Sequence, residues 1–205
     1  MGQVTTGIRS LLDHPRVYHL LQTLLGAHKG RTEFVQNFIR PAAGNLILDI
    51  GCGPAEIIDY LPKVKYWGFD ISPEYISEAK ARHPERTHFF QKEFTENDLG
   101  SLPKFDIALA IGVLHHLDDE TSRQLFNLLH KSLKPGGRVV TIDPCYEEGQ
   151  HPLAKFLISR DRGQNVRTRR GYEALVPDLF SHRHATVRHR AWIPYTHCFM
   201  ECTRT

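Results

Sequence analysis

The amino-acid sequence predicts an α/β fold in which a mostly parallel, doubly wound sheet is covered by helices on both faces. Between residues 46 and 142, short apolar runs alternate with stretches of helical character, and this alternation is typical of a parallel sheet. Near the end of the chain, residues 185–193 and 196–203 are strand-like and flank Pro194-Tyr195. This pattern predicts an antiparallel hairpin that closes the sheet.

The length of 205 residues fits one domain, residues 1–205, because domains commonly have about 100–200 residues. Its first part, residues 1–43, has helical spacing of apolar side chains, for example from Val17 to Leu25, and we expect it to form a lid. Residues 44–145 form the expected ligand-binding core. Residues 146–205 contribute further helices and the hairpin.

The elements of the core and of the C-terminal part follow in order. Ser72-Pro73 predict a helix start, because Ser caps a helix and Pro fits its first turn, and Asp118 or Asp119 caps a later one. Residues 134–137 (KPGG) predict a turn. The expected strands are 46–50, 65–70, 88–91, 105–112 and 138–142, and the expected helices are 55–61, 72–81, 118–132, 152–159 and 171–180.

Composition excludes several classes of protein. Hydrophobic residues make up 40% and charged residues 24%, which excludes wholesale disorder. No apolar run approaches the roughly 18 residues of a membrane span, and charged residues interrupt any signal peptide. Four cysteines are too few for a disulfide scaffold. We therefore expect a cytoplasmic protein without a membrane or metal site.

Glycine and acidic residues follow the expected strands, where parallel sheets bind ligands. Gly51, Cys52 and Gly53 follow the first strand, and Asp70 ends the second. An acid at that position accepts both hydroxyls of a ribose, which predicts a nucleoside cofactor. A dinucleotide fingerprint requires a third glycine at position 56, which is Glu56. A carboxylate there would repel a pyrophosphate, whereas the cationic S-adenosylmethionine suits an acidic site.

The same residues resemble the motifs of class I S-adenosylmethionine-dependent methyltransferases, and of the small "type 11" subgroup in particular. The similar segments are residues 48–54 (LDIGCGP), 68–72 (GFDIS), 105–117 and 133–137. Four motifs in register over residues 44–145 make a strong resemblance. It implies a Rossmann-like sheet of seven strands in the order 3-2-1-4-5-7-6, with the last strand antiparallel. It also implies an enzyme of EC class 2.1.1 that converts S-adenosyl-L-methionine into S-adenosyl-L-homocysteine.

The resemblance also implies roles for single residues. Asp70 holds the ribose, Ile71 packs on the adenine, and Glu93 with Phe94 flanks the adenine amine, although Glu93 replaces the more frequent Asp. Ala55 replaces the usual third glycine. The full set of expected cofactor residues is Asp49, Gly51, Cys52, Gly53, Asp70, Ile71, Glu93, Phe94, Ile111, Gly112 and, on the lid, Tyr18.

Two histidines follow the fourth strand, on the side where a methyl acceptor approaches. A hydroxyl acceptor must lose its proton, and imidazole is a suitable base, so His115 and then His116 are the candidate catalytic residues. Asp143 ends the fifth strand and can orient the imidazole or bind the acceptor. The alternative interpretation of the paired histidines is loop packing, and that of Asp143 is a cap.

The acceptor is expected to be a small, anionic molecule methylated on oxygen or nitrogen. Residues 151–205 carry ten Lys and Arg against four Asp and Glu, and Arg160, Arg162, Arg167 and Tyr172 cluster where an anion can bind. No Asn-Pro-Pro-Tyr-like segment follows the fourth strand, which disfavours methylation of the exocyclic amine of a nucleobase. We expect neither a nucleic-acid partner nor an obligate protein partner. Two alternatives stay open: an RNA- or protein-modifying methyltransferase, and a cofactor-binding protein without transferase activity.

Overall fold

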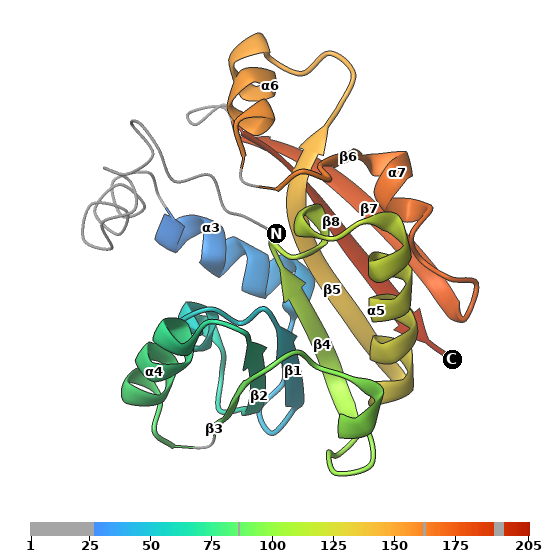
Figure 1. Cartoon of the computed structure of the whole chain (residues 1–205). Helices are drawn as coiled ribbons and strands as arrows, with labels where there is room; N and C mark the ends of the chain where they lie inside the picture. Colours follow the sequence, from blue (N-terminus) through green and yellow to red (C-terminus); the bar gives the residue numbers. More distant parts are fainter. Residues whose placement is uncertain (1–26, 86, 162, 191–194) are drawn as a thin grey trace.

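The computed structural model describes residues 27–205 except 86, 162 and 191–194, and its centre is a twisted sheet (Figure 1). The strand order is β3-β2-β1-β4-β5-β8-β7, and a short β6 pairs with β5. The strands are β1 (Leu46–Ile50), β2 (Lys65–Asp70), β3 (Thr87–Gln91), β4 (Phe105–Ile111), β5 (Leu133–Tyr146), β6 (Arg167–Thr168), β7 (Phe180–Arg190) and β8 (Tyr195–Arg204). Apart from the added β6, this order confirms the prediction, and β8 is antiparallel to β5 as expected.

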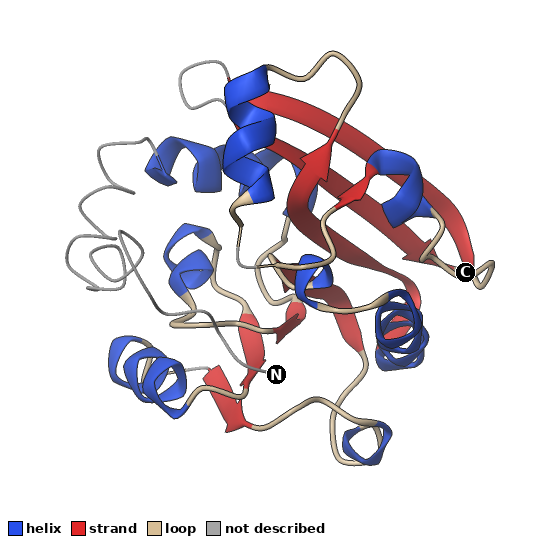
Figure 2. Ribbon diagram, turned by 45° about the horizontal axis from the view of Figure 1, so that its top comes forward, coloured by secondary structure: helices blue, strands red, loops and turns tan. Residues whose placement is uncertain are grey.

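Helices cover both faces of the sheet (Figure 2). One face packs against a cluster that includes Phe38 and Ile76, and the other against a cluster that includes Phe126 and Tyr172. The first face carries α3 (Ala27–Phe34), the π-helical η1 (Val35–Ile39), the 3₁₀-helical η2 (Glu56–Tyr60) and α4 (Pro73–Arg82), and the second carries α5 (Asp119–Ser132) and α7 (Arg169–Glu173). The remaining helices are η3 (Glu96–Asp98), η4 (Leu114–His116) and α6 (Pro152–Ser159).

Local signals explain where two of the helices begin. The Ser72 hydroxyl accepts a hydrogen bond from the Tyr75 amide at 3.2 Å, with Pro73 in the first turn of α4. The Asp118 carboxylate accepts from the Thr121 amide at 2.8 Å at the start of α5. Each cap satisfies an amide that has no partner within its helix. Both predicted caps are confirmed.

The structure departs from the sequence-based expectations in the second half of the chain. The predicted turn at 134–137 lies within β5, whose pairing with β4 is interrupted by a register shift there. The helix expected at 171–180 is confined to α7 (Arg169–Glu173). Pro177 has no amide hydrogen with which to continue the helix, and β7 begins at Phe180. The strand β6 was not expected. The helical pattern from Val17 to Leu25 lies outside the described residues.

The strand register brings the carboxyl ends of the parallel strands to one edge of the sheet, which we call the ligand edge. Ile50 pairs with Ala110 and Ile111 pairs with Ile142, so the carboxyl ends of β1, β4 and β5 lie at the same level. Pro144 in turn pairs with His197 on β8. The loops that leave β1, β2 and β4, and the start of the antiparallel β8, therefore meet at this edge.

Candidate active site

The carboxylate of Asp70 is fixed at the ligand edge by two backbone amides. Its Oδ2 accepts a hydrogen bond from the Gly53 amide at 2.9 Å, and its Oδ1 accepts one from the Ser72 amide at 2.8 Å. An ionised carboxylate has about four acceptor positions. Asp70 is therefore oriented by the protein and retains capacity for further donors, such as the two hydroxyls of a ribose.

The loop after β1 lies tightly against its neighbours. The amides of Gly51 and Cys52 both donate to the Phe69 carbonyl, at 2.8 and 3.1 Å. Gly51 has φ +66, and a Cβ there would lie 2.7 Å from Val113 Cγ2. Gly53 has φ +54, and a Cβ there would meet nothing within 4 Å. Glycine is thus required for the close approach at 51, and open space lies beside position 53.

Apolar and acidic side chains surround this loop. Ile71 is 69% exposed although it is large and apolar, and it directly follows the fixed Asp70. Phe94 is buried with its ring edge-on to Phe69, and Glu93 is exposed. On the other side, Gly112 has φ +68 and its amide donates to the Ile142 carbonyl at 2.8 Å. An adenosine could place its ribose on the Asp70 carboxylate and its apolar adenine face on the exposed Ile71. The residues present therefore fit this part of the cofactor.

Two further expected cofactor residues lie beneath the loop. Asp49 is 1% exposed and accepts a hydrogen bond from the Tyr66 hydroxyl. Burial raises the pKa of Asp49 to about 7 despite that hydrogen bond. Its Oδ1 atom has no hydrogen-bond partner among the residues that the structure describes. Cys52 is also buried, and burial raises the pKa of its thiol. The unpartnered Oδ1 is an acceptor that a donor on the cofactor can use.

Glu56 does not face the ligand edge as an uncompensated charge. It forms an ion pair with Arg31, and its Oε1 lies 3.9 Å from an Nη atom of Arg82. The preceding Ala55 adopts the left-handed conformation with φ +56, which glycine would favour. The electrostatic argument against a pyrophosphate is therefore corrected, because two arginines offset the Glu56 charge.

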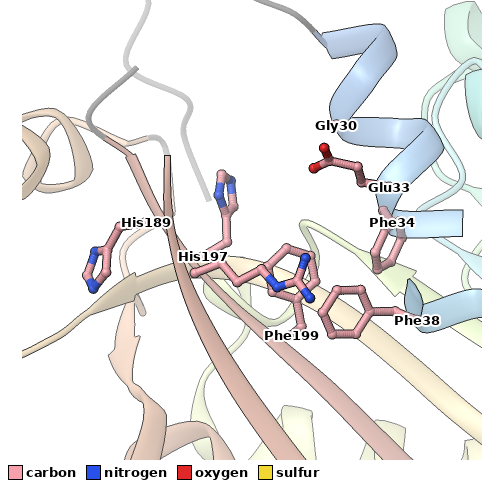
Figure 3. Close-up of a pocket in the computed structure, with 8 residues that line it drawn as sticks. Gly30, Glu33, Phe34, Phe38, His189, His197 and Phe199 are labelled. Atoms are coloured by element: carbon pink, nitrogen blue, oxygen red, sulfur yellow. The ribbon is translucent and has the colours of Figure 1, made fainter. Parts of the chain in front are cut away.

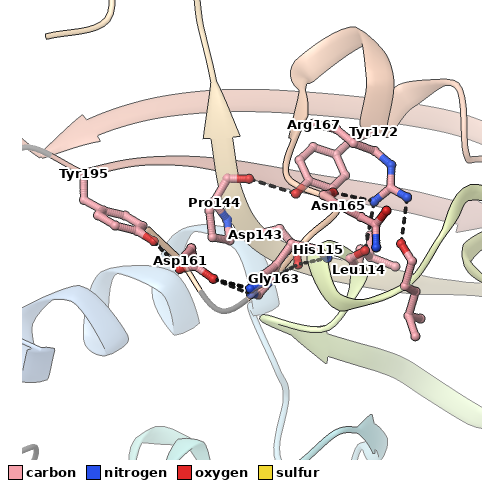
Figure 4. Close-up of polar contacts among 11 residues, drawn as sticks. Leu114, His115, Asp143, Pro144, Asp161, Gly163, Asn165, Arg167, Tyr172 and Tyr195 are labelled. Carbon is pink, nitrogen blue, oxygen red and sulfur yellow. Dashed lines mark hydrogen bonds and ion pairs between the residues drawn. The ribbon is translucent and has the colours of Figure 1, made fainter. Parts of the chain in front are cut away.

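His115 is held between two carboxylates, as Figure 4 shows. Its Nδ1 lies 2.8 Å from Asp143 Oδ1, and its backbone amide donates to the same oxygen at 3.1 Å. Its Nε2 lies 3.3 Å from Asp161 Oδ1. His115 is only 5% exposed and Asp143 only 1%. The sequence predicted the proximity of His115 to Asp143, but not the second carboxylate.

Asp161 belongs to a segment that lies directly on the η4 turn. The Asn165 amide donates to the His115 carbonyl at 2.9 Å, and a Cβ at Gly163 would lie 2.0 Å from His115 Cδ2. The Tyr195 hydroxyl donates to Asp161 Oδ2, and the Gly163 amide donates to Asp161 Oδ1 at 2.9 Å. The imidazole therefore contacts the end of β5 and the segment that contains Asp161 and Gly163, and Tyr195 of β8 is linked to it through Asp161.

These contacts determine the charge of His115. Burial alone would lower its pKa, but the hydrogen bonds to Asp143 and Asp161 outweigh burial and raise the pKa to about 9. For Asp161, the bonds from His115 and Tyr195 outweigh the cost of burial and lower its pKa. Burial raises the pKa of Asp143, and its hydrogen bond to His115 opposes that rise. Near neutral pH the imidazole is a cation that donates from both ring nitrogens.

Two of the expected acceptor residues make structural contacts. Tyr172 is fully buried, and its hydroxyl donates to the Pro144 carbonyl at 2.8 Å. The Arg167 guanidinium donates to the carbonyls of Leu114 at 2.9 Å and Leu117 at 2.7 Å (Figure 4). Buried carbonyls require such donors. Both side chains therefore stabilise the loops at this edge of the sheet, and their binding of an acceptor stays a prediction.

The remaining expected site residues are distributed more widely. The Arg160 guanidinium lies 5.2 Å from the ring centre of Phe156 on α6. The ring of exposed His116 lies 4.0 Å from that of His115. Tyr18 and Arg162 lie outside the described residues. In the part of the chain that the structure describes, no three His, Cys, Asp or Glu side chains are grouped to bind a metal ion, and no helix has the length and apolar character to cross a membrane.

Comparisons with known proteins agree with this geometry. A family model described as a methyltransferase domain matches residues 48–139. Phosphoethanolamine N-methyltransferase 1 of Triticum aestivum is 27% identical over 189 residues, which cover 87% of this chain and 36% of that protein. An O-methyltransferase of Pyrenophora dematioidea is 28% identical over 172 residues, covering 75% of this chain and 64% of that protein. The chain thus spans between one third and two thirds of the length of these relatives.

Solved structures share the fold. The S-adenosylmethionine-dependent methyltransferase SibL superposes with a TM-score of 0.73 at 19% identity, covering 97% of this chain and 59% of SibL. Geranyl diphosphate C-methyltransferase from Streptomyces coelicolor, solved with S-adenosyl-L-homocysteine, has a TM-score of 0.64 at 16% identity and covers 86% of this chain and 76% of that chain. The type 11 subgroup stays a prediction. Residues 48–139 thus match a methyltransferase domain, and the strand order and the solved structures agree with the fold of class I methyltransferases, whose cofactor is S-adenosylmethionine.

Proposed function

We propose that this protein transfers a methyl group from S-adenosylmethionine to an oxygen or nitrogen atom of a small, anionic acceptor. The observation that carries the proposal is the Asp70 carboxylate, which the Gly53 and Ser72 amides fix beside the exposed Ile71. When bound, the cofactor supplies an electrophilic methyl group on its sulfonium. The chain itself has to bind, align the acceptor and exclude water.

Residues on both sides of the Gly51–Gly53 loop would hold the cofactor. Asp70 would accept from the ribose hydroxyls, and Ile71 with Phe94 would contact the adenine, with Glu93 near its amine. Gly112 and Ile111 would lie on the far side. The unpartnered Oδ1 of Asp49 is suited to a cationic donor, because hydrogen bonds to a charged group contribute about 1.5–3 kcal/mol.

For His115 we propose positioning in place of the general-base role that the sequence suggested. Both of its ring nitrogens face carboxylates, so neither is available to accept a proton from an acceptor. The cation instead joins the turn after β4 to the end of β5 and to the 161–165 segment. The exposed His116 is the candidate base for a hydroxyl acceptor, whereas a neutral amine needs none.

The relatives support an O- or N-methyl acceptor of low mass, because their names include O-methyltransferases and phosphoethanolamine N-methyltransferases. The excess of arginine in residues 151–205 favours an acceptor with a negative group, since Arg binds carboxylate and phosphate in two-point contacts. An RNA or protein acceptor, or cofactor binding without transfer, would appear as different outcomes of the same test.

Transfer of a radiolabelled methyl group to a size-fractionated cell extract tests the proposal. Label in the low-mass fraction is expected, and it should be lost with Asp70→Ala. Label in RNA or protein would replace the small acceptor by a macromolecular one. Calorimetric binding of S-adenosyl-L-homocysteine without transfer to any fraction would identify a binding protein. Absence of binding would overturn the cofactor assignment.

A further inference from the structure

A cavity of about 100 Å³ lies between α3 and the β7–β8 hairpin (Figure 3). Its floor is aromatic, because the rings of Phe38 and Phe199 stack 4.3 Å apart and Phe34 packs beside them. Its walls carry charge: Arg188 and His197 come from the hairpin, and Glu33 comes from the opposite side, on α3. No sequence motif singled out these residues.

Strand register places this cavity at the ligand edge. Arg188 on β7 pairs with His197 on β8, and His197 pairs with Pro144 at the end of β5. Phe199 pairs with Ile142, which lies level with Ile111 at the end of β4. Adjacent strands are about 4.8 Å apart. The cavity wall is therefore on the order of 10 Å from the end of β4, within the span of a small acceptor molecule.

The guanidinium of Arg188 is oriented by the aromatic floor. Its central carbon lies 4.8 Å from the ring centre of Phe38 and 6.0 Å from that of Phe199. Stacking of its planar face leaves the N–H groups at its edge available for two-point contact with an anion. Among the residues that the structure describes, no carboxylate forms an ion pair with Arg188.

The other polar groups restrict what can bind. His197 occupies the position directly opposite Arg188. His189 also lines the cavity, but its ring points away from it in Figure 3 and its Nδ1 lies 3.0 Å from Thr196 Oγ1. Glu33 is an exposed carboxylate on α3. It would repel an anionic ligand unless the same molecule also offers Glu33 a hydrogen-bond donor.

We propose that this cavity is the acceptor subsite for a phosphate or carboxylate group, bound by Arg188 and His197, with Glu33 facing an amine or hydroxyl of the same molecule. This inference rests on the proposed function and replaces Arg167 and Tyr172, which the fold uses elsewhere. It narrows the acceptor to small molecules that carry an anionic group and a hydrogen-bond donor on the opposite side.

Binding of inorganic phosphate to the full chain tests the subsite without any methyl transfer. The dissociation constant is measured from shifts of the imidazole C2–H NMR signals at constant ionic strength, with His197→Asn used to assign the His197 signal. Arg188→Met should weaken binding by about tenfold or more. Glu33→Gln should tighten it several-fold, because a like charge is removed. Arg183→Met is the matched control: it lies on the same strand, outside the cavity, and should bind like the wild type.

The two variants are expected to change phosphate affinity in opposite directions, whereas misfolding would weaken binding in both. Wild-type affinity in Arg188→Met, or weaker binding in Glu33→Gln, would overturn the subsite. S-adenosyl-L-homocysteine binding is measured on the same samples. If the cofactor binds and phosphate ignores Arg188, the subsite fails and the proposed function stands. If phosphate binding changes in the variants as expected but no methyl group is transferred, the anion site stands and the proposed function fails.

Discussion

The charge of His115 makes a quantitative prediction about stability and pH. The unfolded chain has an imidazole pKa near 6.5, and the contacts with Asp143 and Asp161 raise it to about 9 in the folded protein. Each pKa unit corresponds to about 1.4 kcal/mol. Because His115 is only 5% exposed, solvent screening is small, and protonation contributes about 3 kcal/mol to the free energy of unfolding.

The sign follows from the direction of the shift. A raised histidine pKa gives a contribution that is complete below pH 6.5 and is lost as the pH rises through about 9. The lowered pKa of Asp161 acts only at low pH, outside this window. We therefore expect the wild type to lose about 3 kcal/mol between pH 6 and pH 10 relative to a variant without the titrating pair.

Urea unfolding, followed by tryptophan fluorescence at several pH values, measures this difference. The reference is His115→Gln/Asp143→Asn, in which amides replace the imidazole and its most buried carboxylate partner, while Asp161 keeps its hydrogen bonds from Tyr195 and Gly163. The exposed His182→Gln is the control for replacing any histidine. The His115 C2–H signal should titrate near pH 9. A difference between wild type and reference that is constant from pH 6 to pH 10 would refute the ion-paired state of His115.

Three further outcomes follow from other contacts. Asp70→Ala should weaken S-adenosyl-L-homocysteine binding by about 10- to 100-fold in calorimetry, as expected for lost hydrogen bonds to a charged group, whereas the exposed Glu78→Ala on α4 should not. Tyr172→Phe should lower the free energy of unfolding by about 1–3 kcal/mol, because it leaves the buried Pro144 carbonyl without its donor; an unchanged urea midpoint would contradict this. Asp49→Asn should raise the free energy of unfolding at pH 8 and not at pH 4. Burial raises the pKa of Asp49 to about 7, so the cost of burying its charge appears only as the pH rises. An equal change at both pH values would show that Asp49 is ionised without cost.

Local sequence signals predicted most of the core correctly. The strands of the motif region and the caps at Ser72 and Asp118 agree with the structure, because a cap or an alternating run depends on neighbours a few residues away. The C-terminal part was predicted less well. The helix predicted over residues 171–180 ends at Glu173, before Pro177, which has no amide hydrogen with which to continue it, and β7 pairs with β8 from Phe180.

The sequence by itself predicted a mostly parallel sheet and its ligand edge, and the resemblance of its motifs predicted the strand order and the cofactor class. Parallel strands end at one edge, so residues such as Gly53 and Asp70 are brought together by topology alone. Tertiary structure alone decided what the acceptor-side residues do. Asp161, 46 positions along the chain from His115, adds to the effect of Asp143 in raising the imidazole pKa, and Arg188 faces Glu33 only because the hairpin packs beside α3. Burial and carboxylates distant in the sequence set the pKa of His115, and distant backbone carbonyls accept hydrogen bonds from the Arg167 guanidinium. Neither effect can be inferred from spacing in the sequence.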